Sequence, residues 1–325
     1  MAGDKTVSVI VPTRNRPELL RATLEAIAFQ AAPTVEIIVV DDGSSPESAR
    51  SNEEFLRRGF DNATYHYIDT AGAKGGGPSF ARNIGIKLAR GRFVAFCDDD
   101  DFWLNTGHLS ECVSLFEQEP ELDFIFANQE SRRDGNAAAQ KSTAKLPKRL
   151  GLIPASSGKS FELSKEECFL GWFPHINTCV FRRELLEKIG GFWVTACWED
   201  LDLYVRAVDA ARRVRYLDRT VAVHNNAASN RLESVTNLLS ATSIEVCATN
   251  VTSHLIYCVR SEAAIRYARR FGGEAYRTLA LDAHRRSHRK SDRTRASAFA
   301  QLGFAARLSV KWAVVTFFFL VRRWI

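Results

Sequence analysis

Short apolar runs alternate with amphipathic segments along the first 225 residues of the chain. The runs at residues 7–11, 36–40 and 93–97 are nearly continuous and rich in β-branched or aromatic side chains, a pattern typical of buried strands in a parallel sheet. After the first run, Pro17 suits the first turn of a helix, and apolar residues recur behind it at helical spacing. Because two parallel strands require a crossover connection, these segments predict a β-α-β unit and an α/β fold.

Predicted strands and helices continue to alternate after this unit, and the last part of the chain has helical patterns alone. We expect a weaker strand at residues 65–68, helices at 80–89, 108–118, 183–189 and 199–211, and strands at 124–127, 214–217 and 221–224. Residues 131–160 are rich in Arg, Lys, Ala, Ser and Gly, which is typical of a surface loop. Only helical patterns follow from about residue 234. The sequence therefore predicts two domains, residues 1–233 and a basic, mainly helical extension at residues 234–325.

The composition excludes several classes of protein. Of the 325 residues, 46% are hydrophobic and 25% are charged, which are values of globular proteins and not of disordered, collagen-like or coiled-coil chains. The mean hydropathy of −0.18 argues against a multi-span membrane protein. The seven cysteines form no CxxC motif and no cluster with histidine, so we expect reduced thiols in a cytoplasmic protein, without disulfides or a zinc site. The N-terminal residues lack a basic segment followed by a cleavable apolar core, so we do not expect secretion.

Charge is distributed unevenly along the chain. Residues 259–325 hold 15 Lys and Arg and 4 Asp and Glu, a net charge of +11, whereas residues 1–258 carry −5. Residues 296–325 have a helical pattern with an apolar run at 312–321, followed by Arg322 and Arg323; this run is too short for the roughly 20 residues that span a bilayer. We expect this helix to lie in the interface of an anionic membrane, or alternatively to dock on the first domain or on a second subunit. The acidic body lacks any nucleic-acid-binding motif, so no nucleic acid partner is expected.

Polar side chains follow three of the predicted strands at the point where each strand ends. They are Pro12, Thr13 and Arg14 after the first strand, Asp41 and Asp42 after the second, and Asp98, Asp99, Asp100 and Asp101 after the fourth. Ligands of open α/β sheets bind beyond the carboxyl ends of the strands. We therefore expect these residues to build one site.

The four consecutive aspartates repel one another, and protonation or a bound cation must relieve that repulsion. At neutral pH a divalent ion can do so, and oxygen ligands without neighbouring Cys or His favour Mg²⁺ or Mn²⁺. Because Mg²⁺ commonly completes its coordination with substrate phosphates, a diphosphate-bearing substrate is implied. The alternative is a solvent-facing acidic turn or a carboxylate cluster at a helix start.

Residues near the second strand end suit a nucleotide. Asp42 can accept a hydrogen bond from a base imide or a ribose hydroxyl, or can be a turn residue, whereas Asp41 is expected to be structural. The glycines at residues 75–77 lack the GxxxxGK[ST] pattern of a phosphate loop. We expect instead a flexible loop that lets Arg82 and Asn83 approach the nucleotide.

A third group of residues opens the helix predicted at 199–211. Glu199 and Asp200 suit a helix N-terminus electrostatically, and one of them can also act as a general base that takes a proton from a sugar hydroxyl. Asp202 and Arg206 have i, i+4 spacing and are expected to brace the helix.

Five segments of this sequence together resemble the family 2 glycosyltransferases with the GT-A fold, over about residues 5–225. In chain order they are VSVIVPTRNRPELL, EIIVVDDGSS, PSFARNIGIKLARGRFVAFCDDDD, FRRELLEKIGGF and WEDLDLYVRA. The resemblance implies a Rossmann-like GT-A domain, a nucleotide-sugar donor, a divalent metal and inversion at the anomeric carbon.

The resemblance also implies roles for individual residues. With the residues already singled out from the pattern included, the full set expected to bind the nucleotide sugar is Pro12, Thr13, Arg14, Asp42, Arg82, Asn83, Asp98 and Asp99. The outer residues of the DxD motif, Asp98 and Asp100, are the expected metal ligands, with Asp100 the more direct. Asp200 matches the catalytic base, Trp198 and Glu199 are candidate acceptor contacts, and His224 resembles a position near the diphosphate or metal. The sequence departs from the family pattern at Arg14, where an aromatic residue is common, and at Asp99 and Asp101, which add charge.

The expected protein is thus an inverting, metal-dependent glycosyltransferase of the hexosyltransferase type, with UDP as the nucleotide by resemblance. Its expected acceptor is a glycan or lipid-linked glycan of cell-surface or exopolysaccharide synthesis, and its expected place is the inner face of the cell membrane. A sugar-nucleotide nucleotidyltransferase is the alternative enzyme, although PTRNRPE lacks the glycine-rich triphosphate loop that such an enzyme needs. A non-catalytic nucleotide- or glycan-binding protein of the same fold is the third interpretation.

Overall fold

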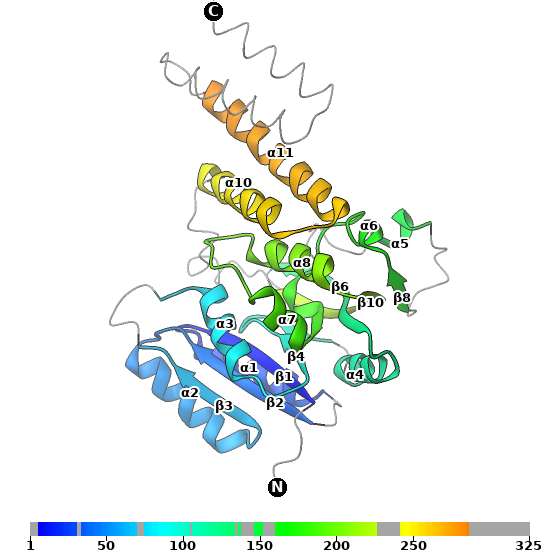
Figure 1. Cartoon of the computed structure of the whole chain (residues 1–325). Coiled ribbons are helices and arrows are strands. Elements are labelled where there is room, and N and C mark those ends of the chain that lie inside the picture. The colour runs from blue at the N-terminus through cyan, green and yellow to red at the C-terminus, as the bar shows by residue number, and fades with distance from the viewer. Residues whose placement is uncertain are drawn as a thin grey trace, which may run out of the picture. The chain divides into compact units, whose positions relative to one another are not determined.

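The computed structural model describes residues 6–30, 34–69, 75–104, 106–133, 136–137, 146–151, 160–225 and 241–285 (Figure 1). The chain divides into two compact units, Met1–Val194 with Ala210–Arg231, and Thr195–Asp209 with Leu232–Ile325. The sequence pattern placed the helix at residues 199–211 in the first domain. This helix, α8 (Glu199–Ala210), instead falls almost entirely within the second unit.

The first unit is built on a mixed sheet, which has ten strands among the described residues. Four parallel strands have the order β3-β2-β1-β4, and β9, β6, β10 and β5 continue the sheet, in which β6 and β10 form a second parallel pair. β7 pairs with β6, and β8 pairs with β10. The strands are β1 (Val7–Thr13), β2 (Val35–Asp41), β3 (Ala63–Tyr67), β4 (Phe93–Phe96), β5 (Phe102–Trp103), β6 (Leu122–Arg133), β7 (Asn136–Ala137), β8 (Ser160–Leu163), β9 (Cys179–Arg182) and β10 (Arg213–Asn225).

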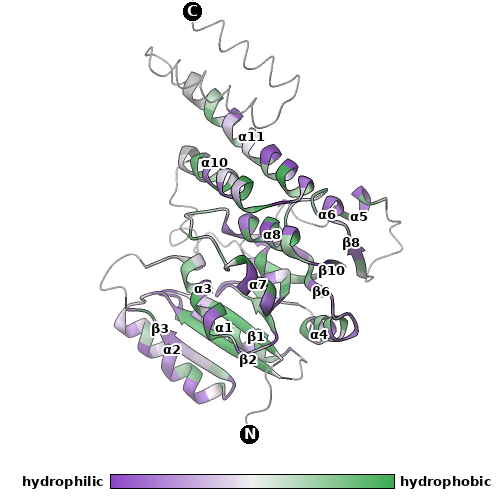
Figure 2. Cartoon of the chain, viewed as in Figure 1, coloured by the Kyte–Doolittle hydropathy of each residue, from purple (hydrophilic) through white to green (hydrophobic). Residues whose placement is uncertain are grey.

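Alternate side chains of β1 pack on opposite faces of this sheet. Val9 and Val11 belong to a buried cluster with Leu20 of α1 (Pro17–Ala28) and with residues of α2 (Pro46–Gly59) and α4 (His108–Gln118). On the other face, α3 (Pro78–Leu88) approaches β1 so closely that a Cβ atom on Gly85 would lie 2.3 Å from Cγ2 of Ile10. Figure 2 shows β1 and β2 in apolar colours, as burial under helices on both faces requires.

Local sequence signals set the starts of the helices that follow β1, β2 and β3. Proline is the first residue of α1, α2 and α3, where its fixed φ suits the helix and its missing N–H costs no hydrogen bond. Ser45 caps α2 by accepting a hydrogen bond from the N–H of Ser48 (3.3 Å). The apolar pattern did not predict α2, because only Asn52 and Leu56 of its residues are buried. The cap and Pro46 were the signals that could have found it.

Two other expectations are corrected. The strands predicted at residues 214–217 and 221–224 are parts of the single strand β10, which stays paired with β6 through several register shifts. The expected loop at 131–160 is not a loop throughout its described part, because β6 extends to Arg133 and is followed by β7 and α5 (Leu146–Arg149). The end of β6 is polar, so its strand conformation depends on pairing with β10. The hydropathy of the sequence gives no sign of this pairing.

The second unit comprises α8, α10 (Ala241–Cys258) and α11 (Glu262–Arg285), and α10 packs against α11. Among the helices that the structure describes, none combines the length and the apolar character that crossing a bilayer requires. Residues 296–325, where the interfacial helix was expected, lie outside the described residues. The first unit also contains the short helices α6 (Lys165–Cys168) and α7 (Arg183–Ile189) and the 3-10 helix η3 (Ile176–Thr178).

A buried carboxylate links β1, β2 and the segment before β4. Glu36 of β2 accepts hydrogen bonds from the Ser8 hydroxyl (2.5 Å) and from the backbone N–H groups of Arg90 (2.6 Å) and Gly91 (3.2 Å). Burial acts to raise the pKa of Glu36, but these hydrogen bonds and the Arg90 guanidinium outweigh it, so the pKa lies below its usual value.

We expect Glu36→Gln to lower the free energy of unfolding at pH 7 by about 1–3 kcal/mol, because an amide cannot accept from all of these donors. The lowered pKa means that ionised Glu36 stabilises the folded state above the unfolded pKa of about 4.3 and that this contribution is lost as the pH falls through the folded pKa. Urea unfolding at several pH values should therefore show the difference from the unsubstituted protein shrinking below about pH 4. Glu47→Gln, at an exposed position of α2, is the control. A difference that does not change with pH would contradict the assignment.

Candidate active site

The polar ends of β1, β2 and β4 meet at one edge of the sheet, as the sequence predicted. Thr13 is paired in register with Asp41, and the N–H of Asp42 donates to the Thr13 carbonyl (2.9 Å). β4 lies on the other side of β1 and leads through Cys97 into the four aspartates. The parallel arrangement of these strands is therefore what brings the acidic residues beside the β1 loop.

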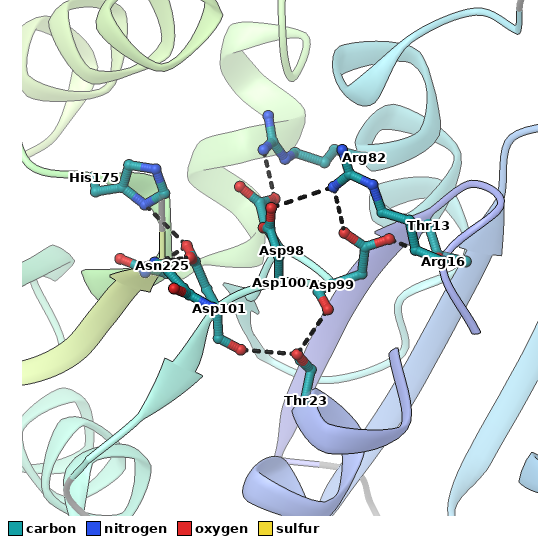
Figure 3. Close-up of polar contacts among 11 residues, drawn as sticks. Thr13, Arg16, Thr23, Arg82, Asp98, Asp99, Asp100, Asp101, His175 and Asn225 are labelled. Carbon is teal, nitrogen blue, oxygen red and sulfur yellow. Dashed lines mark hydrogen bonds and ion pairs between the residues drawn. The ribbon is translucent and has the colours of Figure 1, made fainter. Parts of the chain in front are cut away.

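The four aspartates alternate between two environments (Figure 3). The side chains of Asp98 and Asp100 are 22% and 21% exposed, whereas those of Asp99 and Asp101 are 6% and 1% exposed. Two carboxylates are thus buried as part of the structure, and two remain partly open to an incoming ligand.

Residues of β1 and α1 hold the first half of this turn. The Thr13 hydroxyl donates to Asp99 Oδ2 (2.8 Å), and Arg16 Nη1 donates to Asp99 Oδ1 (3.0 Å). The hydroxyl of Thr23, on α1, lies 3.0 Å from the carbonyl oxygen of Asp99 and 2.8 Å from that of Asp101. The side chain of Asp99 is therefore fixed by residues at the end of β1 and in the loop after it, and the backbone of the turn is fixed by α1.

Residues from distant parts of the chain hold Asp101. The Asn177 side-chain amide donates to Asp101 Oδ2 (2.8 Å), and the backbone N–H of Asn225 donates to Oδ1 (2.9 Å). His175 Nδ1 lies 3.7 Å from Asp101 Oδ2, and Figure 3 shows this ring beside the carboxylate. Both oxygens of Asp101 already accept hydrogen bonds, which makes Asp101 a poorer candidate than Asp98 or Asp100 for direct ligand binding.

Two arginines face the more exposed carboxylates. Arg82 Nη2, from α3, lies 2.6 Å from Asp98 Oδ1, and the Arg82 guanidinium also lies over the Phe192 ring. Arg16 Nη1 lies 3.2 Å from Asp100 Oδ2. Among the residues that the structure describes, these two guanidinium groups contact three of the four carboxylates, so negative charge exceeds positive charge in this cluster.

The pKa values of the aspartates reflect this excess. Burial raises the pKa of Asp101 well above its usual value, and the charges of Asp100 and Asp98 add to the rise. Burial also raises the pKa values of Asp99 and Asp100, with Arg16 opposing the rise in both. Only Asp98 has a lowered pKa, because the charge and hydrogen bond of Arg82 outweigh its burial. Full ionisation of this cluster requires more positive charge than the two arginines supply.

Two half-buried imidazoles complete the cluster. The rings of His175 and His224 stack with centroids 4.4 Å apart, and burial lowers the pKa of His175 to about 3 and that of His224 below its usual value. Neutral imidazoles present a lone pair and add no positive charge. Ligand atoms of Asp98, Asp101 and His175 lie within 4.8 Å of one another. A donor set of carboxylates and neutral imidazoles with excess negative charge fits a divalent cation. Asp98 belongs both to the pair expected from the sequence, Asp98 and Asp100, and to the group of Asp98, Asp101 and His175.

The expected nucleoside contacts form a second cluster around Gly75. Asp42 accepts hydrogen bonds from the N–H groups of Gly76 (2.9 Å) and Gly77 (2.7 Å). A Cβ atom on Gly75 would lie 2.5 Å from Asp42 Oδ2 and 2.9 Å from Arg14 Nη1, and its φ of +77° is left-handed. Arg14 and Asp42 therefore come together as expected, and the close approach of backbone and carboxylate explains the glycine.

Other predicted residues have structural partners. Asn83 makes two hydrogen bonds of 2.8 Å with the backbone N–H and carbonyl of Phe192, so its amide ties α3 to that segment. Asp41 accepts from the Tyr65 hydroxyl (2.6 Å) and from the N–H of Ser44 (2.8 Å), in keeping with the structural role expected for it. Pro12 is buried within β1.

The remaining predicted residues belong to the second unit. Glu199 and Asp200 form the first turn of α8, and Trp198 precedes them with a left-handed φ of 67°. Arg206 Nε donates to Asp202 Oδ2 (2.8 Å), which confirms the predicted i, i+4 pair.

Several residues of the aspartate cluster escaped the sequence pattern, namely Arg16, Thr23, His175 and Asn177. Arg16 stands within the β1 loop and could have been found from its proximity to Arg14. The others reach the aspartates across 74 or more positions of the chain, and no local motif marks them.

Comparisons with known proteins bear on this site. The family model described as Glycosyl transferase family 2 matches residues 8–190. A Campylobacter jejuni protein named GalNAc(5)-diNAcBac-PP-undecaprenol beta-1,3-glucosyltransferase is 32% identical over 182 residues, covering 56% of this chain and 53% of the relative. The Escherichia coli UDP-Glc:alpha-D-GlcNAc-diphosphoundecaprenol beta-1,3-glucosyltransferase WfgD is 31% identical over 127 residues, covering 39% of this chain and 47% of the relative. The chain thus spans about half the length of these two relatives.

Solved structures with similar folds extend over most of the chain. S. aureus TarS 1-349 in complex with UDP-GlcNAc has a TM-score of 0.67 and 20% identity, covering 91% of this chain and 81% of that one. The mannosyltransferase PcManGT from Pyrobaculum calidifontis, in complex with GDP-Man and Mn²⁺, has a TM-score of 0.56 and 18% identity, covering 98% and 85%. These likenesses support the GT-A fold. Because the family model covers more than half of the sequence, the chain belongs to glycosyl transferase family 2.

Proposed function

We propose that this protein is an inverting glycosyltransferase that moves a sugar from a nucleoside diphosphate to an acceptor hydroxyl. The observation that carries the proposal is the aspartate cluster at the ends of β1 and β4 in a chain of this family. Its excess negative charge suits a site that binds a cation together with a diphosphate, and it would be an unexplained cost in a purely structural turn.

The proposed donor is a nucleotide sugar with a uridine base. Thr13, Arg14 and Asp42 lie together at the ends of β1 and β2, where the nucleoside would bind, and the E. coli relative is named as a UDP-Glc enzyme. In such a complex, a hydrogen-bond donor of the base or ribose would compete with the N–H groups of Gly76 and Gly77 for the Asp42 carboxylate. Arg82 contacts Asp98, beside the proposed diphosphate position.

Asp98 and Asp100 are the proposed ligands of Mg²⁺ or Mn²⁺, because they are the more exposed carboxylates of the cluster. When bound, the cation would offset the charge that develops on the departing diphosphate. Arg16 and Thr13 hold Asp99 in place behind these ligands. His224 stands close enough to Asp100 for the charge of that carboxylate to act on the pKa of His224, against the larger effect of burial.

Asp200 is the proposed general base. A sugar hydroxyl is a weak nucleophile until a carboxylate takes its proton, and displacement by that hydroxyl in one step inverts the anomeric carbon. Glu199 and Trp198, which flank the start of α8, are proposed acceptor contacts.

The proposed acceptor is a glycan linked to a lipid diphosphate, as used in cell-surface or exopolysaccharide synthesis. The names of the C. jejuni and E. coli relatives both specify undecaprenyl diphosphate-linked glycans. Such an acceptor resides in a membrane, and the basic segment at residues 259–325 would suit peripheral contact with the anionic inner face.

Alanine substitution within the aspartate turn separates metal binding from folding. We expect Asp100→Ala to weaken Mn²⁺ binding by about tenfold or more, at least the loss typical of an outer-shell partner, and to leave metal-free stability intact or improved. Asp101→Ala should instead lower metal-free stability by about 1–3 kcal/mol, because Asn177 and Asn225 lose a buried acceptor. Calorimetric Mn²⁺ titration and urea unfolding measure the two effects. Unchanged Mn²⁺ affinity in Asp100→Ala would remove Asp100 from the ligand set.

A panel of UDP- and GDP-sugars, with Mn²⁺, Mg²⁺ or EDTA, tests the reaction itself through released nucleoside diphosphate. We expect release from one donor in the presence of metal and none in EDTA. Asp200→Asn should reduce turnover by about 10²–10⁴-fold while UDP still binds, because only proton removal is lost. Asp61→Asn removes a carboxylate from an exposed turn and is the control. Full activity of Asp200→Asn, or a product with retained anomeric configuration, would refute this mechanism.

A further inference from the structure

The segment that carries Asp200 is anchored at three points by the helices that follow it in the second unit. The first anchor is Trp198, whose indole N–H donates to the carbonyl of Ile244 on α10 (3.3 Å) and whose ring meets that of Phe271 on α11 edge-on, with centroids 5.1 Å apart. A left-handed φ costs a bulky residue about 1–3 kcal/mol, so contacts of this kind must hold it. Both α10 and α11 therefore hold Trp198, the residue immediately before α8.

The second anchor lies one turn into α8. Asp202 is fully buried, and its Oδ1 atom lies 2.7 Å from Nδ1 of His254 on α10, while Arg206 donates to Oδ2. Because a carboxylate only accepts, Nδ1 of His254 carries the proton, and Nε2 lies 3.3 Å from Sγ of Cys258. Both ring nitrogens are engaged, which fixes the orientation of the imidazole against α8.

The third anchor is at the other end of α8. Asp209 accepts hydrogen bonds from the backbone N–H groups of Arg260 (2.8 Å) and Ser261 (2.8 Å), immediately before α11 begins. This carboxylate satisfies donors at the start of α11 and joins it to α8. The three anchors together explain why α8 groups with α10 and α11 rather than with the sheet.

We propose that α10 and α11 position the catalytic base, and that His254 is the principal positioning residue. The proposal rests on the proposed role of Asp200. Asp202 follows Asp200 by two residues, and the N–H of Asp202 donates to the Trp198 carbonyl (3.0 Å), so the first two anchors bracket Asp200 on both sides. His254 acts on Asp200 only through the backbone of α8, by holding Asp202.

This arrangement separates catalysis from donor binding. A shift of about 1 Å in a reacting group can cost about 10²-fold in rate, whereas the residues proposed to bind the nucleotide lie on β1, β2 and α3. Loss of the His254 contact should therefore reduce the rate of the chemical step and leave nucleotide affinity unchanged.

The test compares His254→Leu, which cannot hold Asp202, with His254→Asn, whose amide can donate near the position of Nδ1. We expect His254→Leu to lower kcat for nucleoside diphosphate release by about 10–100-fold, with KM for the donor and UDP affinity within about twofold. His254→Asn should recover most of the lost kcat. Ser253→Ala, on the exposed side of α10, is the matched control and should leave kcat unchanged. Equal kcat in all variants, or a loss of UDP affinity that accounts for the lost activity, would overturn the proposal.

Hydrogen exchange gives a readout that needs no activity. In His254→Leu, amides of residues 199–205 should exchange faster, while those of β1 and β2 keep their protection. Unchanged exchange at 199–205 would overturn the positioning role even if Asp200 is the base. Faster exchange there in a protein that turns over no donor would support the positioning role and refute only the proposed function.

Discussion

The organisation of the candidate site depends on four adjacent carboxylates, Asp98 to Asp101, which follow the buried strand β4. Like charges in a buried turn are unfavourable, and the fold relieves them in two ways. Asp99 and Asp101 are buried and receive hydrogen bonds from residues of several elements. Asp98 and Asp100 remain partly exposed, each facing one arginine. The unmatched negative charge that remains is the physical basis for assigning a cation to this edge of the sheet.

The same packing that forms the core also assembles this site. Thr23 reaches the aspartate turn from α1, on one face of the sheet, and Arg82 reaches Asp98 from α3, on the other. The close approach of α3 to β1 at Gly85 therefore contributes to the electrostatics of the site as well as to stability. A change in the packing of either helix would alter the charge balance around the four carboxylates.

Much of this arrangement could be predicted from the sequence, because its signals are local. Apolar runs marked β1, β2 and β4, and the polar residues after them met at one edge as parallel topology requires. Contacts between distant residues had no such signal: Asn177 and Asn225 meet Asp101 across 76 and 124 positions, and Asn83 pairs with Phe192 across 109. The apolar pattern also failed to predict α2 and the end of β6, because α2 buries few side chains and the polar end of β6 depends on its partner strand. The membership of α8 in the second unit follows from anchors on α10 and α11, which helical periodicity does not encode.

Binding of Mn²⁺ with and without UDP, followed by electron paramagnetic resonance, tests the central claim most directly. If the carboxylates after Cys97 hold a cation that also contacts the diphosphate, each ligand should increase the affinity of the other. We expect UDP to tighten Mn²⁺ binding by about tenfold or more, a coupling free energy of about 1.4 kcal/mol or greater. An Mn²⁺ affinity that is the same with and without UDP, or no Mn²⁺ binding at all, would contradict the account.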